Sequence, residues 1–486
     1  MGVSHSIAKF GFCSIIALAP LPFGSTDIKV VAVWVILLGI ATVLAGNRQY
    51  SMREIAILVG LAIVVACWAF VVIQQMASPP FLADILVDPI WRQASRLLDE
   101  HLTPSVAVAL NQPYFAAGAQ ITCVLSLTCG LFLGQSRTTA HTILNVFAIS
   151  GLAYATFGIV SFILDPTHVL WRLKASYVSS LTATFTNRNT AAVYLGSCAI
   201  AWALMLANSI GKPSEPNAFR KFMARRLFFA PSRRTITCAC AFLIVIAAMF
   251  MTSSRAGVTF SLAMLAGALL TFFRSIITAS YRSMSITLLV LPAAFLAIFE
   301  IFGSKINQRF EVGGLSDVGR IHVYESTLAI IRDHPWLGTG LGTFVWVFPR
   351  YRSADISALG IWDRAHSTPL ELAAEMGLPF GVVVIIGWSL MLYLLANGMS
   401  RRKRDQILPM TAFWIGMLAM THSLIDFSLQ IPAVSIIVLG LIGMGLAQSA
   451  SPRTRLPSAK MRLDSPVRKM ENTAGISARS GMELLT

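Results

Sequence analysis

Long apolar segments recur along most of this 486-residue chain, and they restrict its fold more than any other feature. A helix needs about 20 consecutive apolar residues to cross the hydrocarbon of a bilayer, because each residue advances the helix axis by about 1.5 Å. Many segments here have that length. Open strands leave backbone groups without hydrogen bonds in lipid, so the spanning segments must be helical. The pattern therefore predicts an all-α polytopic membrane protein.

Twelve segments are candidates for transmembrane helices. They lie at residues 9–24, 28–46, 54–76, 115–134, 140–165, 189–209, 236–252, 256–273, 284–302, 376–396, 408–424 and 430–448. The first segment is short, so a cleaved signal peptide is the alternative to a retained helix. We expect a retained helix, because we find no small-x-small cleavage site and the residues at 20–25 are typical of a turn.

Basic residues give the chain a formal net charge of +16, although only 12% of its residues are charged. Their distribution argues against nucleic-acid binding, because they gather in alternate loops, as the positive-inside rule requires of cytoplasmic loops. These loop residues are Arg48, Arg53, Arg137, Lys212, Arg220, Lys221, Arg225, Arg226, Arg233, Arg234, Arg274, Arg282 and the run 401–404. The sequence thus predicts a domain at residues 1–448 with both termini cytoplasmic. The basic tail at 449–486 is expected to be disordered.

The polar segment at 303–375 then forms one large exterior loop, periplasmic in a bacterial inner membrane. It carries seven Lys/Arg and three His, and long loops are exempt from the charge rule, so topology does not explain its basic residues. We expect a helix from about Val318 to Asp333, followed by a turn-rich strip of glycines. A second helix should start after Ser367 and continue directly into the membrane. We expect the chemistry of the protein in this loop.

Two short polar junctions lie at the exterior ends of apolar segments. Arg255 stands in Thr252-Ser-Ser-Arg-Ala-Gly, between two helices with almost no loop. A charge near hydrocarbon is costly unless it has a partner, so Arg255 is a candidate ligand-binding residue, with snorkelling to the headgroups as the alternative. Arg188 is flanked by Asn187 and Asn189, a set that suits an anionic or sugar ligand. The alternative is that Asn187 simply caps the helix.

Arg320 and His366 are the candidates within the large loop. Arg320 opens the first loop helix, and a guanidinium at a helix N-terminus is a good phosphate ligand, although an ordinary solvated Arg is the alternative. His366 stands where the loop re-enters the membrane, and an imidazole suits proton transfer near neutral pH. A structural role at a helix start is the alternative for His366. Cations that hold a diphosphate and a base that activates a hydroxyl would suit glycosyl transfer.

Two further motifs are weaker. His422 and Asp426 share a helix face but have no adjacent third metal ligand, so we expect a structural capping role. The glycine strip at 338–342 lacks the Lys-Ser/Thr end of a phosphate loop, so we do not expect it to bind a nucleotide.

Four stretches together resemble the O-antigen ligase and O-antigen polymerase family of bacterial inner-membrane glycan transferases. They are Phe185-Thr-Asn-Arg-Asn-Thr-Ala-Ala, Thr252-Ser-Ser-Arg-Ala-Gly, Gly319-Arg320 through His334-Pro-Trp-Leu-Gly-Thr-Gly-Leu-Gly, and His366-Ser-Thr-Pro-Leu-Glu-Leu-Ala-Ala-Glu-Met-Gly377. The resemblance covers roughly residues 180 to 445. Family ligases follow the last glycine with a small residue three positions later, where this chain has Phe380. Ligase, polymerase and protein-glycosylating roles therefore all remain open.

The resemblance implies a fold like that of C-type glycosyltransferases, without metal, nucleotide or other cofactor. It implies an undecaprenyl-diphosphate-linked glycan as donor, and a hydroxyl of lipid A core, a growing polysaccharide or a protein as acceptor. His366 would be the base, and Arg188, Arg255 and Arg320 would hold the diphosphate. A transporter or flippase of the lipid-linked glycan is the competing reading, and a non-enzymatic assembly subunit is a third. We find no internal repeat of the kind that many transporters show.

Overall fold

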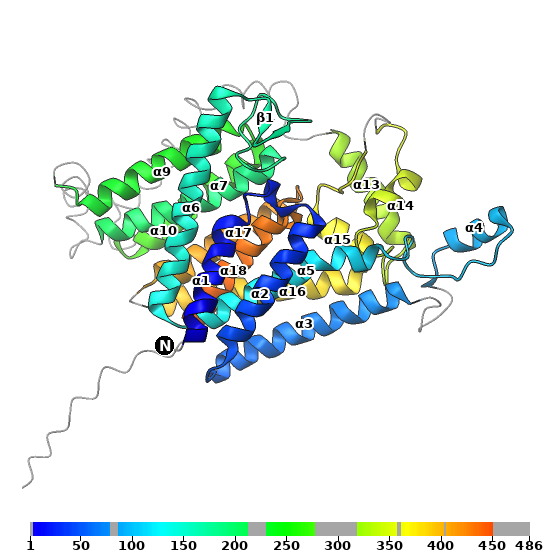
Figure 1. Ribbon diagram of the computed structural model, residues 1–486, viewed down its shortest axis with the longest axis horizontal. Helices are drawn as coiled ribbons and strands as arrows, with labels where there is room; N and C mark the ends of the chain where they lie inside the picture. The colour runs from blue at the N-terminus through cyan, green and yellow to red at the C-terminus, as the bar shows by residue number, and fades with distance from the viewer. Residues whose placement is uncertain are drawn as a thin grey trace, which may run out of the picture. The chain divides into compact units, whose positions relative to one another are not determined.

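The computed structural model describes residues 3–77, 86–211, 230–277, 318–356, 361–402 and 405–450, which are almost entirely helical (Figure 1). In chain order the helices are α1 (Val3–Leu18), η1 (Phe23–Ser25), α2 (Ile28–Gly46), α3 (Met52–Met76), α4 (Ile90–Leu98), α5 (Gln112–Leu133), α6 (Arg137–Leu164), α7 (Arg188–Ile210), α9 (Arg233–Met251), α10 (Arg255–Ile277), α13 (Val318–Asp333), α14 (Phe344–Tyr351), α15 (Thr368–Met376), α16 (Leu378–Arg401), α17 (Ile407–Ser423), η5 (Ser428–Gln430) and α18 (Pro432–Ala450). Two short antiparallel strands, β1 (His168–Val169) and β2 (Arg172–Leu173), form a hairpin after α6.

Within this part of the chain, nine helices are long and apolar enough to span a membrane. They are α2, α3, α5, α6, α7, α9, α10, α16 and α18. The shorter apolar helices α1 and α17 occupy two more of the predicted positions. The predicted span at 284–302 and the tail from 451 lie outside the described residues. The chain is thus an all-α polytopic membrane protein, as its apolar pattern predicts.

The centre of the bundle is formed by α7 and α18. In each of these helices, 94% of the residues in the apolar stretch are buried. Glycines let α18 approach α5 closely. A Cβ on Gly443 would lie 2.1 Å from the Leu127 carbonyl oxygen, and one on Gly130 would lie 2.2 Å from the Gly440 oxygen. Such close contact between small residues is a main source of helix association in lipid, where apolar side chains gain little by leaving the solvent.

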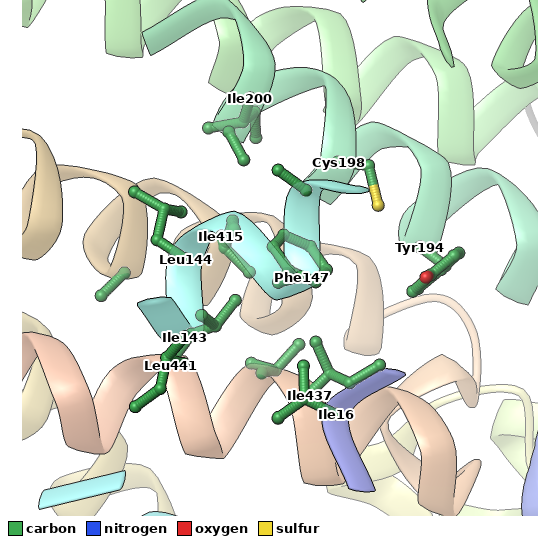
Figure 2. Close-up of a cluster of buried hydrophobic side chains, with 14 of the residues drawn as sticks. Ile16, Ile143, Leu144, Phe147, Tyr194, Cys198, Ile200, Ile415, Ile437 and Leu441 are labelled. Atoms are coloured by element: carbon green, nitrogen blue, oxygen red, sulfur yellow. The ribbon is translucent and has the colours of Figure 1, made fainter. Parts of the chain in front are cut away.

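Figure 2 shows large side chains from several helices meeting in the core. Phe147 of α6 and Tyr194 of α7 make an edge-to-face contact, with ring centroids 6.3 Å apart. Ile415 of α17 and Ile437 of α18 are almost fully buried in the same cluster. The outer helices instead expose apolar side chains, such as Ile63 of α3, as expected of surfaces that face lipid.

The first helix begins six residues earlier than predicted and ends at Leu18. A helix can extend past the hydrocarbon into the polar interface, so an apolar count alone misplaces its start. The turn expected at 20–25 is present. Ser25 Oγ donates to the Ala19 carbonyl oxygen (2.6 Å) and accepts from Trp34 Nε1 (2.8 Å). Phe12 is fully buried against the bundle.

Helices α13, α14 and α15 pack around a small core of their own, built from Val323, Ile330, Phe344, Phe348 and their neighbours. The helix predicted at 318–333 is present as α13. The glycine strip is also present, and Gly338, Gly340 and Gly342 all have positive φ. Helix α14 was not predicted, because Pro349 lies inside it and it is only eight residues long. Its stability comes from packing rather than from helix propensity.

The expected continuous helix from residue 368 into the membrane is wrong, because Gly377 separates α15 from α16. Gly377 has φ of 83°, and a Cβ there would lie 2.1 Å from the Trp336 carbonyl oxygen. The backbone of the glycine strip therefore passes directly against this break. Pro379 in the first turn of α16 suits the start of a new helix. The break lets α15 change direction relative to α16 and pack against α13 and α14.

Candidate active site

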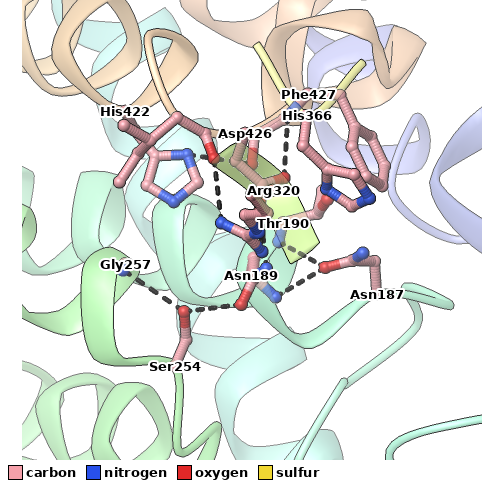
Figure 3. Close-up of polar contacts among 12 residues, drawn as sticks. Asn187, Asn189, Thr190, Ser254, Gly257, Arg320, His366, His422, Asp426 and Phe427 are labelled. Atoms are coloured by element: carbon pink, nitrogen blue, oxygen red, sulfur yellow. Dashed lines mark hydrogen bonds and ion pairs between the residues drawn. The ribbon is translucent and has the colours of Figure 1, made fainter. Parts of the chain in front are cut away.

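Asp426 lies between the end of α17 and η5, and its carboxylate joins three segments of the chain (Figure 3). Its Oδ2 accepts from Asn189 Nδ2 (2.6 Å) and lies 3.4 Å from Arg320 Nη2. Its Oδ1 accepts from the Phe427 amide (2.7 Å). The side chain is 1% exposed, so its charge depends on these donors. Asp426 thus ties the start of α7 and the start of α13 to the end of α17.

Asn189 carries the network on to the junction of α9 and α10. Its Oδ1 accepts from Ser254 Oγ (2.8 Å), and Ser254 Oγ in turn accepts from the Gly257 amide (3.2 Å). Ser254 immediately precedes Arg255, the first residue of α10. Both ends of the Asn189 amide therefore have a protein partner, which indicates a positioning role. Asn187 caps α7, accepting from the amides of Asn189 (2.7 Å) and Thr190 (3.3 Å).

The network brings two helix N-termini together. Arg188 opens α7 and Arg255 opens α10. The helices are in close contact near these ends, because a Cβ on Gly257 would lie 2.5 Å from Ala192 Cβ. A helix N-terminus carries a partial positive charge and free amide donors. Two such termini beside two guanidinium groups favour an anionic ligand.

Arg320 and Arg188 have different surroundings. Arg320 Nη1 donates to the Ile425 carbonyl oxygen (3.0 Å) while Nη2 faces Asp426, so its planar group is held in one orientation. Its side chain is 24% exposed and so remains accessible to a ligand. The Arg188 guanidinium lies over the Tyr177 ring, 4.9 Å from its centroid. Arg188 Nε is buried and has no hydrogen-bond partner within the described residues. Both cations are thus oriented before a ligand arrives.

His366 lies in a turn directly before α15, with φ of 54°. Its ring contacts Trp362 and Phe427 edge-to-face, with centroid distances of 5.6 and 5.2 Å. Its carbonyl oxygen accepts from the Tyr324 hydroxyl (3.0 Å). A non-glycine residue with positive φ is uncommon, and such strain occurs often at active sites. The turn and the two rings hold the imidazole in place.

The His366 turn is joined directly to the Asp426 network. Phe427, whose ring contacts His366, follows Asp426 in the chain, and Thr368 Oγ1 donates to the Asp426 carbonyl oxygen (3.2 Å). Figure 3 shows His366 and Phe427 on the same side of Asp426 as Arg320. Asp426 therefore bonds to two predicted residues, Asn189 and Arg320. Arg188 and Arg255 directly adjoin network residues in the chain, and His366 lies beside the network. The sixth predicted residue, Asn187, acts as a helix cap in this structure.

Two glutamates of α15 were not singled out from the sequence. Glu371 accepts from the Ala365 amide (2.7 Å) and from Arg364 Nη1 (3.1 Å), so it braces the chain directly before His366. Glu375 accepts from the amides of Gly342 and Phe344, both at 2.9 Å. Burial raises the pKa of both carboxyls, and the charge of Glu371 helps to raise the pKa of Glu375 to about 8. Their i, i+4 spacing on one predicted helix was the available signal.

Asp426 was also underestimated, because the sequence indicated only a capping role for it and His422. His422 is fully buried, and its Nδ1 lies 3.3 Å from Ser428 Oγ. That contact holds the turn that carries Asp426. The partners of Asp426 come from residues more than 100 positions away, so no local spacing could reveal them.

A large apolar cavity of about 1490 Å³ runs beside the network. Its walls come mainly from α3, α5, α16 and α18. One end is lined by polar residues at the start of α15 and directly before it, including Arg364, Thr368 and Glu371. Thr368 is also a member of the Asp426 network. An apolar groove between membrane helices that ends beside a cationic site suits a ligand with a long hydrocarbon chain and an anionic head.

Comparison with known protein families gives one match. A family model described as O-antigen ligase matches residues 240–386. The match includes Arg255, Arg320, His366 and the two glutamates of α15, whereas Arg188 and Asp426 lie outside it. No curated protein matches the chain. The chain is therefore a polytopic membrane protein with an O-antigen ligase family domain at residues 240–386.

Proposed function

We propose that this protein transfers a glycan from an undecaprenyl-diphosphate carrier to a hydroxyl acceptor. The observation that carries the proposal is the buried network of Asn189, Ser254, Arg320 and Asp426. It joins the start of α7, the α9–α10 junction and the start of α13, where Arg188, Arg255 and Arg320 lie. The acceptor is lipid A core, a growing polysaccharide or a protein. The reaction takes place on the periplasmic face of a bacterial inner membrane, with both chain termini cytoplasmic. The O-antigen ligase family match supports this class of reaction.

The diphosphate of the donor binds at the start of α7 and α10 in this proposal. Arg188 and Arg255 supply charge there, and the helix N-termini add partial positive charge. Arg320 adds a third positive charge, and its side chain is partly exposed. These cations also stabilise the extra negative charge that develops on the diphosphate as it leaves.

His366 takes the acceptor proton. The acceptor oxygen attacks the anomeric carbon of the donor sugar, and the new carbon–oxygen bond forms as the bond to the diphosphate breaks. The electron pair of the broken bond leaves with the diphosphate carrier, and the proton passes to the imidazole of His366. Trp362 and Phe427 fix the ring in place, which keeps the base oriented toward the acceptor.

The apolar cavity holds the prenyl chain of the donor. Its polar end at Arg364 and Thr368 lies beside the Asp426 network, so the diphosphate reaches the cations while the chain stays among apolar walls. We expect the reaction to be independent of metal, because three guanidinium groups can neutralise a diphosphate. Addition of EDTA to the purified protein should then leave turnover unchanged.

The test is an assay with purified protein, lipid-linked glycan donor and acceptor, in which turnover and donor affinity are measured separately. His366→Ala should reduce turnover by roughly 10²–10⁴-fold, as expected for a lost general base. Donor affinity should remain, because the three arginines are unchanged. His141→Ala is a matched control, since His141 pairs with Asp405 away from the site. Loss of donor affinity with unchanged turnover would make His366 a binding residue. Movement of donor across the membrane without transfer would indicate a flippase.

A further inference from the structure

The end of the apolar cavity opposite the catalytic network is also polar, and it is basic. Arg53, in the first turn of α3, and Arg401, the last residue of α16, both line this end. Asn397 and Ser449 line it as well. The acidic residues that line the cavity, Asp363 and two glutamates of α15, all belong to the exterior segment. The two ends of one groove therefore differ in charge.

Neither Arg53 nor Arg401 makes an ion pair or a side-chain hydrogen bond within the described residues, and both are exposed. The acids nearest to them in the chain are already engaged. Glu54 is buried and pairs with Arg48, and Asp405 pairs with Arg137 and His141. Two cations at the mouth of an apolar groove therefore face outward without a protein counter-charge in this part of the structure.

The walls of the groove between the two arginines suit acyl chains. Helices α3 and α16 run side by side there (Figure 1). Gly60 and Leu61 of α3 line the groove together with Met391 and Leu394 of α16. A basic pocket between membrane helices on the cytoplasmic side is a typical headgroup site for anionic lipids. The charge pattern of the loops predicts that this end is cytoplasmic.

We propose that an anionic phospholipid of the leaflet at this end binds in the groove, with its phosphate held by Arg53 and Arg401. Its acyl chains lie along α3 and α16 and fill the part of the cavity farthest from the catalytic network. The lipid completes the wall between these two helices. The lipid site lies at the opposite end of the cavity from the proposed diphosphate site, and its occupancy is measurable without any glycan transfer.

The test is lipid binding to the purified, delipidated protein, by native mass spectrometry and by thermal unfolding in nanodiscs. The probes are phosphatidylglycerol and phosphatidylcholine. We expect phosphatidylglycerol to bind more tightly and to raise the unfolding temperature more. In Arg53→Gln/Arg401→Gln its binding should weaken by about thirtyfold, since each cation near a lipid surface contributes roughly fivefold.

Two control variants sharpen the result. Arg53→Lys/Arg401→Lys keeps both charges and should keep most of the preference for phosphatidylglycerol. Arg233→Gln/Arg234→Gln removes two cations at the start of α9, which do not line the groove, and should change nothing. Equal binding of phosphatidylglycerol to the Arg53/Arg401 glutamine variant and the native protein would overturn the proposal. So would a loss in that variant of undecaprenyl phosphate binding only, because the donor chain would then occupy this end.

Discussion

Replacement of Asp426 by Asn tests the network most directly, because it removes one charge and preserves the shape of the side chain. Asp426 Oδ1 accepts from the Phe427 amide and Oδ2 from Asn189. An asparagine has only one oxygen, so its NH₂ group must face one of these donors. That leaves a buried donor unsatisfied, at a cost of about 1–3 kcal/mol. Arg320 also loses its charged partner, which adds about 1 kcal/mol because its side chain is partly exposed to solvent.

The two costs of Asp426→Asn together amount to about 2–4 kcal/mol. This free energy is divided between a less stable folded state and a higher barrier to catalysis. Since about 1.4 kcal/mol corresponds to a factor of ten, we expect turnover to fall by roughly 10–100-fold, with the remainder seen as a lower unfolding temperature. Asp405→Asn is the matched control, since Asp405 is also a largely buried carboxylate, and it pairs with Arg137 and His141 away from the site. That variant should lose stability and keep its turnover per folded molecule.

The assay measures transfer of glycan from purified donor to acceptor, normalised to folded protein. A second arm combines Asp426→Asn with Arg320→Gln. If Asp426 acts by orienting Arg320, the double variant should be little worse than Arg320→Gln alone. Turnover of Asp426→Asn within about threefold of the native value would refute the reasoning, and so would an equal loss in Asp405→Asn.

Three further predictions follow from the same geometry. Arg255→Ala should abolish transfer while the protein remains in the membrane, and Arg255→Lys should restore part of it, since lysine keeps the charge but loses the bidentate group; near-native activity of the alanine variant would remove Arg255 from the diphosphate site. The pKa of Glu375 is raised from an ordinary value near 4.5 to about 8, so as pH rises between these values the unfolded chain loses a proton that the folded protein keeps, and the folded state loses stability. The unfolding temperature should therefore fall from pH 6 to 8.5 in the native protein and fall less in Glu375→Gln, and parallel curves would contradict this. In intact spheroplasts, and in a background without the native cysteines, an impermeant thiol reagent should label Ala354→Cys and not Thr138→Cys, and the opposite result would reverse the orientation.

Much of the fold could be predicted from the sequence because lipid places the same requirement on every spanning segment. Each spanning segment must be apolar and helical over about 20 residues, so the positions of α2, α3 and α18 follow from hydropathy alone. The helix at 318–333 and the positive-φ glycine strip after it were also predictable, because His334-Pro335 and the glycines are strong local signals. The continuous helix beyond residue 368 was a wrong prediction, since Gly377 breaks it through a contact with Trp336 that lies 41 positions earlier.

In the candidate site, too, one part could be predicted from the sequence and another could not. Charge and position pointed to Arg188, Arg255, Arg320 and His366 individually, because a cation or an imidazole at a membrane interface is unusual by itself. Their association could not be predicted, since it depends on Asp426, whose partners lie 237 and 106 positions away in the chain.

The amino-acid sequence by itself thus determined the membrane-spanning helices, the helix at 318–333 with the glycine strip after it, and the identity of the cations. Only the tertiary structure decided that Asn189, Ser254 and Asp426 join the helix starts that carry these cations, and that Glu371 and Glu375 brace the His366 turn and the glycine strip. The physical reason is the range of the interactions. Hydropathy acts on each segment independently, whereas a buried carboxylate acquires its role only from the donors that folding brings to it.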